Sequence, residues 1–153
     1  LVTPEDCKDL LLWRNDTVTR QMSLSGDKIR EEEHIVWFSK MISSVDQCAV
    51  IGEKNAKKFG VVLFREQCCE ALVSINLAPQ FRGKGLSSLL LSKSIQWYLQ
   101  THREIKYFTA KIKDVNHGSI RIFMQNGFEL VSTVDRLNTY RLTVRTMENL
   151  RNV

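Results

Sequence analysis

The amino-acid sequence predicts a single α/β domain, built on a mixed and mostly antiparallel β-sheet with helices packed against it. Three observations support this prediction. Two helical segments come first, three strand-like runs then follow one another closely, and a strand–loop–helix–strand crossover precedes a closing hairpin. The 153 residues, 43% hydrophobic and 25% charged, suit one continuous core. We therefore expect residues 1–153 to form one domain.

The first two elements are predicted to be helices. Thr3, Pro4 and the two acidic residues after them are typical of an N-cap, a proline at the first helical position and an acidic first turn. A second helix is expected over residues 28–43, and its apolar stripe comprises Ile35, Phe38 and Ile42. Three aromatic side chains of this front half are expected to anchor the core: Trp13, Trp37 and Phe38.

The remaining elements are predicted from alternation and turn residues. Residues 48–52, 59–65 and 70–77 are expected to pair as an antiparallel meander, and residues 86–100 to form a helix. Phe108, Ala110 and Ile112 alternate with polar residues, which is typical of a strand with one covered face. Asn116 is expected to cap a short helix that Gly127 ends, before strands over residues 128–134 and 139–145.

Composition excludes several classes of protein. No apolar run approaches the eighteen or so residues of a membrane span, and no signal-peptide pattern is present. The four cysteines lack the spacing of a metal site or a disulfide framework, which favours free thiols, no metal and a cytoplasmic location. The chain begins with Leu1 rather than Met, which agrees with a domain that is truncated or excised from a larger protein.

The net charge favours a small phosphate-bearing ligand. Lys and Arg number 22 against 17 Asp and Glu, a balance of +5, and the cations are spread along the chain. Proteins that read a nucleic-acid duplex usually gather their cations on one face. We therefore expect no nucleic-acid partner.

The stretch QFRGKGLS, residues 80–87, lies between a predicted strand and a predicted helix. The first amides of a helix have no intrahelical partner, and the helix dipole adds positive charge there. Gly83 and Gly85 allow the backbone to approach an anion closely, while Arg82 and Lys84 add charge at the rim. The loop predicts a phosphate site, although a plain strand-to-helix turn would have similar glycines.

The surrounding segments resemble the GNAT superfamily of acyl-CoA-dependent N-acetyltransferases. SINLAPQFRGKGLSSLLL looks like that family's pyrophosphate loop, carried by Gln80, Gly83 and Gly85. NHGSIRIFMQNGF looks like its Asn-x-x-Ser…Gly-Phe segment, which begins at Asn116 and Ser119. The resemblance implies a GNAT-like sheet, acetyl-CoA as cosubstrate and a small primary amine as acceptor.

The resemblance also implies which residues contact acetyl-CoA. The amides from Arg82 to Ser87 would hold its pyrophosphate, and Leu77 would offer backbone N–H and C=O groups to the pantetheine arm, where the family's strands splay apart. The residues implied in cofactor binding are Leu77, Gln80, Phe81, Arg82, Gly83, Lys84, Gly85, Leu86, Ser87, Asn116, Ser119 and Phe123.

Three residues are candidates for catalysis. The N–H of Leu77 is the candidate donor to the developing oxyanion. Relatives often protonate the departing thiolate with a Tyr, but the matching residue here is Phe123, so Tyr140 or a water would replace it. Glu70 is the ionisable residue on the polar row of strand 70–77 and is the candidate base, with solvated strand-end carboxylate as the alternative.

A site with no strong base favours an amine of low pKa. An amine near pKa 7.8 is neutral in roughly one of seven molecules at pH 7, far more often than a lysine amine near 10.4. An amino sugar or a peptide α-amine fits this requirement.

Residues 11–38, in the N-terminal part of the chain, suggest what the acceptor is. The planar side chains of Arg14 and His34 could hold a heterocyclic base between them by stacking. The pattern W-R-N-D…E-H-x-x-W-F resembles the GNAT branch that acetylates nucleotide-linked amino sugars, including the pseudaminic acid pathway. It implies substrate binding by Arg14, His34, Asn15 and Ser74, and transfer of acetyl to a UDP-linked amino sugar by direct attack.

Two other functions remain open at this stage. One is a GNAT enzyme for protein N-termini or another small amine, and the other is a non-catalytic acyl-CoA-binding module, which the Phe at position 123 makes conceivable. The sequence leaves the oligomeric state open.

Overall fold

The computed structural model describes residues 1–144, and within them it has a six-stranded sheet in the order β1-β2-β3-β4-β6-β5. Every neighbouring pair is antiparallel except β3 and β4, which are parallel. This confirms the predicted mixed α/β fold. The strands are β1 (Gln47–Lys54), β2 (Lys57–Gln67), β3 (Glu70–Leu77), β4 (Tyr107–Lys113), β5 (Glu129–Val134) and β6 (Leu137–Thr143).

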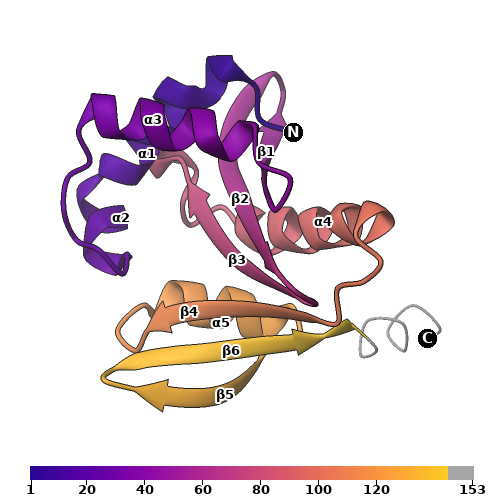
Figure 1. Ribbon diagram of the computed structural model, residues 1–153. Helices are drawn as coiled ribbons and strands as arrows, with labels where there is room; N and C mark the ends of the chain where they lie inside the picture. Colours follow the sequence, from indigo (N-terminus) through magenta and orange to yellow (C-terminus); the bar gives the residue numbers. More distant parts are fainter. Residues whose placement is uncertain (145–153) are drawn as a thin grey trace.

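Helices cover both faces of the sheet. They are α1 (Cys7–Asn15), α2 (Thr17–Met22), α3 (Glu31–Ile42), α4 (Leu86–Thr101) and α5 (His117–Gln125), with short 3-10 turns at Pro4–Asp6 and Pro79–Phe81. Figure 1 shows α1, α2 and α3 gathered over β1–β3, while α5 lies against β4. None of the helices between residues 1 and 144 is long and apolar enough to cross a membrane.

The apolar residues divide into two clusters, one on each face. The larger cluster joins α4 and α5 to the sheet and includes Phe64, Tyr98 and Phe108. The smaller cluster, which includes Trp13 and Phe38, packs α1 and α3 against β1 and β2. Both faces of the central strands are therefore covered, which holds β3 rigidly between the two helical layers.

The predicted apolar stripe of the second helix is wrong by one residue. The buried residues of α3 are His34, Phe38 and Met41, whereas Ile35 and Ile42 are 48% and 40% exposed. A helical stripe repeats every three to four residues, so placing His34 on the buried side moves both isoleucines outward. Trp37 is also 40% exposed, which corrects its prediction as a core anchor.

The short α2 helix was not predicted. Asp16 caps it by accepting a hydrogen bond from the Thr19 amide, 3.1 Å long, and none of its residues is buried. A helix of six residues without a buried stripe leaves no periodic signal in the sequence. At the other end of the chain, Arg145 of the predicted last strand lies outside the described residues.

Strands β3 and β4 pair only at their beginnings. The parallel register comprises Glu70–Tyr107, Ala71–Phe108 and Leu72–Thr109. Beyond these pairs the two strands diverge, as Figure 1 shows. The divergence opens the sheet beside the second half of β3.

Candidate functional site

A cavity of about 580 Å³ lies where β3 and β4 diverge, and we call it the larger cavity. It extends from residues 82–83, before α4, along residues 73–77 of β3 to the start of α5 at Asn116. Residues far apart in sequence thus line one continuous space.

The glycine-rich loop forms one end of the larger cavity. Gly83 and Gly85 have φ values of 72° and 71°, in the left-handed region that favours glycine. A Cβ built on either glycine meets no atom within 4 Å, so the backbone faces open space. Gly85 is the N-cap of α4 and offers no side chain to cap it, which leaves the first amides of the helix available to an anion.

The backbone of Leu77 faces the diverging edge. The Ala78 amide donates to the Phe59 carbonyl over 3.0 Å, which sets the phase of the β2–β3 ladder. Successive residues of an antiparallel strand direct their N–H and C=O groups to alternate edges, so Leu77 and Ile75 direct theirs toward β4. In the described part of the chain, no strand pairs with this edge of β3 beyond Leu72. These polar groups are available to a ligand.

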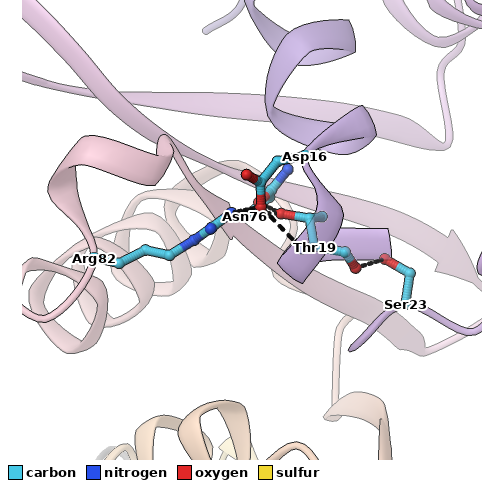
Figure 2. Close-up of polar contacts among 5 residues, drawn as sticks. All are labelled: Asp16, Thr19, Ser23, Asn76 and Arg82. Carbon is cyan, nitrogen blue, oxygen red and sulfur yellow. Dashed lines mark hydrogen bonds and ion pairs between the residues drawn. The ribbon is translucent and has the colours of Figure 1, made fainter. Parts of the chain in front are cut away.

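The Arg82 side chain does not point along the loop but reaches α2. Its Nη2 lies 2.7 Å from Asp16 Oδ2 and 2.7 Å from Thr19 Oγ1 (Figure 2). This guanidinium lowers the pKa of Asp16, chiefly through the hydrogen bond. Lys84 Nζ instead lies 5.1 Å from the centre of the Phe81 ring. The loop therefore ties the sheet to α2. The Arg82 amide donates to the Pro79 carbonyl over 3.3 Å and is not available to a ligand, whereas the first amides of α4 are.

The start of α5 forms the other end of the larger cavity. Asn116 Oδ1 accepts from the Ser119 amide over 3.1 Å, so Asn116 is the predicted N-cap and also lines the cavity with Ser119. Phe123 lines it as well and is 2% exposed, with its ring edge-on to Phe128 at 4.9 Å. Of the implied cofactor-binding residues, the following do not line the cavity: Gln80, Phe81, Lys84, Gly85 and Leu86.

A second cavity of about 390 Å³, the smaller cavity, adjoins the first on the side of α1–α3. Both cavities are lined by Arg14, Thr19, Ser23, Ser74, Ile75 and Asn76. His34 and Trp37 line only the smaller one. The structure thus brings Arg14, His34 and Ser74 together around one space.

His34 is a buried, neutral imidazole. It is 2% exposed, its Nε2 lies 2.9 Å from the Cys7 carbonyl oxygen, and its ring centre lies 5.2 Å from that of Trp37. Burial lowers the pKa of His34, and the bond to Cys7 offsets only part of this effect. Because a carbonyl oxygen only accepts, Nε2 carries the hydrogen and Nδ1 is left as an acceptor.

One guanidinium nitrogen of Arg14 has no hydrogen-bond partner in the described part of the chain. Its Nη2 donates to the Ser25 carbonyl over 2.8 Å, while its buried Nη1 has no partner among residues 1–144. Burial, followed by repulsion from Arg20, lowers the pKa of Arg14. A guanidinium still keeps its charge at neutral pH.

The charged side chains that line the two cavities are cations, although one of them, Arg82, is paired with Asp16. No aspartate or glutamate of the described chain lines either cavity, whereas three cations do: Arg14, Arg82 and Lys111. An anionic group would be attracted to this space, and a polycation would be repelled.

Three of the predicted catalytic and substrate-binding residues do not line either cavity. Asn15 instead clamps the chain by exchanging two hydrogen bonds of 2.8 Å with the backbone of Ile29. Tyr140 is 4% exposed within the larger apolar cluster, because its alternate position on β6 faces the core. Glu70 lies at the paired end of β3, roughly 23 Å from Leu77 at about 3.3 Å per residue.

The Glu70 carboxylate is already engaged by neighbouring side chains at this paired end of β3. It accepts a hydrogen bond from the Thr109 hydroxyl and lies 3.5 Å from Arg141 Nη2. We therefore do not retain Glu70 as the general base or Tyr140 as the acid. Thr19 and Asn76, which line both cavities, were missed, since single polar residues carry no local signal of their shared position.

Comparison with known proteins places these features in one family. The family model described as Acetyltransferase (GNAT) domain matches residues 1–129. No curated protein matches the sequence significantly.

Three solved structures illustrate the similarity. An aminoglycoside acetyltransferase in complex with coenzyme A is 17% identical, with 99% of this chain and 96% of that chain covered and a TM-score of 0.84. The ribosomal-protein-alanine N-acetyltransferase from Brucella melitensis is 19% identical, with 94% and 97% covered and a TM-score of 0.78. The N-acetyltransferase PseH from Campylobacter jejuni is 14% identical, with 94% and 92% covered and a TM-score of 0.71. Identities this low show a shared fold alone.

Proposed function

Because the chain belongs to the GNAT family of acetyltransferases, we propose that its acceptor is the primary amine of a nucleotide-linked amino sugar, most simply a UDP-linked one. The family makes the protein an acetyl-CoA-dependent acetyltransferase, with acetyl-CoA as cosubstrate. The acceptor, the residues in contact with it and a cytoplasmic location are our proposal. The four unpaired cysteines agree with that location.

The residues around the larger cavity fit acetyl-CoA. The open space over Gly83 and Gly85, at the start of α4, suits a pyrophosphate. The available N–H and C=O groups of Leu77 and Ile75 suit the amides of a pantetheine arm, while Asn116 and Ser119 lie at the far end. The thioester supplies an activated acetyl group, and every other contribution comes from the chain.

The absence of carboxylates around the cavities of the described chain carries the proposal for the acceptor. Polyamines and aminoglycosides bear several ammonium groups and need carboxylate partners, because burying an unpaired charge is costly. A nucleoside diphosphate bears negative charge, which Arg14 and Lys111 would attract. Arg82 would contribute less, because its Nη2 lies 2.7 Å from Asp16 Oδ2. An amine on a nucleotide-linked sugar therefore suits this lining better than a polycation does.

Arg14 and His34 support a site for the nucleobase. Both line the smaller cavity, one as a guanidinium with a spare donor and the other as a neutral imidazole beside Trp37. A guanidinium such as that of Arg14 stacks on heterocycles, whereas His34, which is 2% exposed, would support the site from behind. Ser74 would contact the sugar from β3.

The chemistry requires little from ionisable side chains. The Leu77 amide would donate to the oxyanion as the amine attacks. Phe123 cannot donate a proton, but a thiolate near pKa 8.5 leaves without an acid, and general acid catalysis typically contributes only about 10²- to 10⁴-fold. The amine would arrive neutral, which an amino-sugar amine of low pKa does more readily than a lysine.

An acceptor panel tests this function. Purified protein is incubated with acetyl-CoA and either a UDP-linked 4-amino-4,6-dideoxy sugar, spermidine, an aminoglycoside or a peptide with a free α-amine, and thiol release is followed. We expect the nucleotide sugar to have the highest kcat/KM. Preference for the peptide would favour an enzyme for protein N-termini instead. Coenzyme A binding without turnover of any amine would favour a binding module.

A further inference from the structure

A chain of polar contacts crosses from the glycine-rich loop to the junction of the two cavities. It begins with Asp16 and Arg82, passes through Thr19 and ends at the Asn76 side chain on β3 (Figure 2). Thr19 and Asn76 line both cavities. The contacts therefore connect the loop to the place where the two substrates would meet.

The donor and acceptor roles along this chain follow from the groups and from the orientation of the Asn76 amide, whose Oδ1 faces Thr19. Arg82 Nη2 can only donate, so Thr19 Oγ1, 2.7 Å away, accepts from it. The single proton of the Thr19 hydroxyl is then given to Asn76 Oδ1 over 3.2 Å. With its oxygen so occupied, the Asn76 amide is held in one orientation, and its Nδ2 donors are directed away from Thr19.

Two further contacts keep Thr19 in place. Its amide donates to Asp16 Oδ2 over 3.1 Å, and its carbonyl accepts from the Ser23 hydroxyl over 2.6 Å. The cation at the start of the chain also polarises each bond after it, which strengthens the donors at its end. Asn76 is thus a fixed donor rather than a freely rotating amide.

An N–H donor at this point selects the chemistry of its partner. It repels an ammonium, and if it bound the lone pair of the attacking amine it would prevent the attack. Its useful partner is an oxygen next to the amine. Asn76 precedes Leu77, whose N–H is the proposed oxyanion donor, so this oxygen would be held close to the reacting carbonyl.

We propose that Asn76 Nδ2 binds an oxygen on the carbon next to the acceptor amine, a role that rests on the acetyl transfer proposed above. Thr19 and Arg82 are positioning residues, which hold Asn76 in the donating orientation. The acceptor would then be a vicinal amino alcohol, such as an amino sugar with a neighbouring hydroxyl, in preference to a plain alkylamine.

The test compares Thr19→Val, which keeps the shape and loses the hydroxyl, with Thr19→Ser, which keeps the hydroxyl. Thr17→Val, at an exposed position of the same helix, is the matched control. Each variant is assayed on two pairs of amines that differ only in the neighbouring hydroxyl: UDP-linked 4-amino sugars with and without it, and 2-aminocyclohexanol against cyclohexylamine. The ratio of variant to wild type cancels the intrinsic reactivity of each amine.

We expect Thr19→Val to lower kcat/KM about tenfold for the hydroxylated member of a pair and less than about twofold for the other member. Thr19→Ser and Thr17→Val should stay within about twofold of the wild type on both, and the Kd for coenzyme A should be unchanged in all three. A hydroxyl-dependent loss on either pair supports the positioning role, even if the nucleotide proves unimportant and the proposed function fails.

Equal losses on both members of each pair, or a Thr19→Ser variant as impaired as Thr19→Val, would overturn the positioning role and leave the proposed function standing. A wild-type protein that acetylates none of the four amines would overturn both.

Discussion

The larger and the smaller cavity are built in different ways. At its loop end the larger cavity presents backbone: two left-handed glycines, the start of α4 and the diverging edge of β3. The smaller cavity presents side chains from α1, α3 and β3, including Arg14, His34 and Asn76. Backbone groups do not depend on residue identity, which suits the cosubstrate that we propose they bind, acetyl-CoA. Side chains can change from one chain to the next, which suits the choice of acceptor.

The strongest loss of function is expected from a substitution in the glycine-rich loop, where the larger cavity presents backbone groups. Gly83→Val places a β-branched side chain at φ 72°, a conformation that costs roughly 1–2 kcal/mol for residues other than glycine, and fills the open space over the loop. We expect the Kd for coenzyme A to rise about 10- to 100-fold, which is roughly 1.4–2.8 kcal/mol. Isothermal titration calorimetry measures the change.

The matched control for this prediction is Gly26→Val, where a Cβ would meet only the Arg20 carbonyl oxygen at an ordinary 3.7 Å. It should bind coenzyme A like the wild type. A Gly83→Val variant that binds equally well would remove the loop from the cofactor site.

A smaller effect, on the KM for the acceptor, is expected from replacing Arg14. Arg14→Ala removes a guanidinium that lines both cavities, so KM for the UDP-linked amino sugar should rise about tenfold, with the Kd for coenzyme A unchanged. Steady-state kinetics and calorimetry separate the two constants. Lys8→Ala, at an exposed position of the same helix, is the control, and an unchanged KM in Arg14→Ala would exclude the stacking role.

The buried imidazole of His34 predicts that the free energy of unfolding depends on pH. Burial lowers the pKa of His34 below its ordinary value of 6.5, so the unfolded chain binds a proton more readily than the folded one. This contribution to stability is complete above pH 6.5. It declines as the pH falls from there toward the lower folded pKa. Urea unfolding between pH 7.5 and pH 5 measures the slope.

His34→Asn should flatten this dependence, whereas His117→Asn, at an exposed position of α5, should preserve it. If the free energy of unfolding changes with pH equally in the wild type and in His34→Asn, then folding does not alter proton binding by His34 and the prediction is wrong.

The smallest effect is expected at the paired end of β3. Glu70 lines neither cavity, so Glu70→Gln should keep kcat/KM within about twofold of the wild type. The free energy of unfolding should fall by no more than about 1 kcal/mol, because the ion pair with Arg141 is partly exposed. A pH–rate profile checks the kinetic expectation. A tenfold fall in kcat with loss of the acidic limb would restore Glu70 as the base.

The order of the six strands and of the longer helices, and the position of the glycine-rich loop, could be predicted from the sequence. Alternation in β3, the glycines at 83 and 85 and the cap at Asn116 are local signals, because backbone conformation responds to residues a few positions away. These predictions required no knowledge of distant contacts. The GNAT family was recognised from the same local segments.

Which side chains share a cavity depends on the packing of the elements and could not be predicted from the sequence. Three features depend on where each strand and helix lies in space. They are the buried stripe of α3, the ion pair of Arg82 with Asp16, and the position of Glu70 at the far end of β3 from Leu77. Thr19 and Asn76 are 57 residues apart in sequence, yet they share a hydrogen bond. Such contacts arise from packing between layers, for which short-range patterns contain no information.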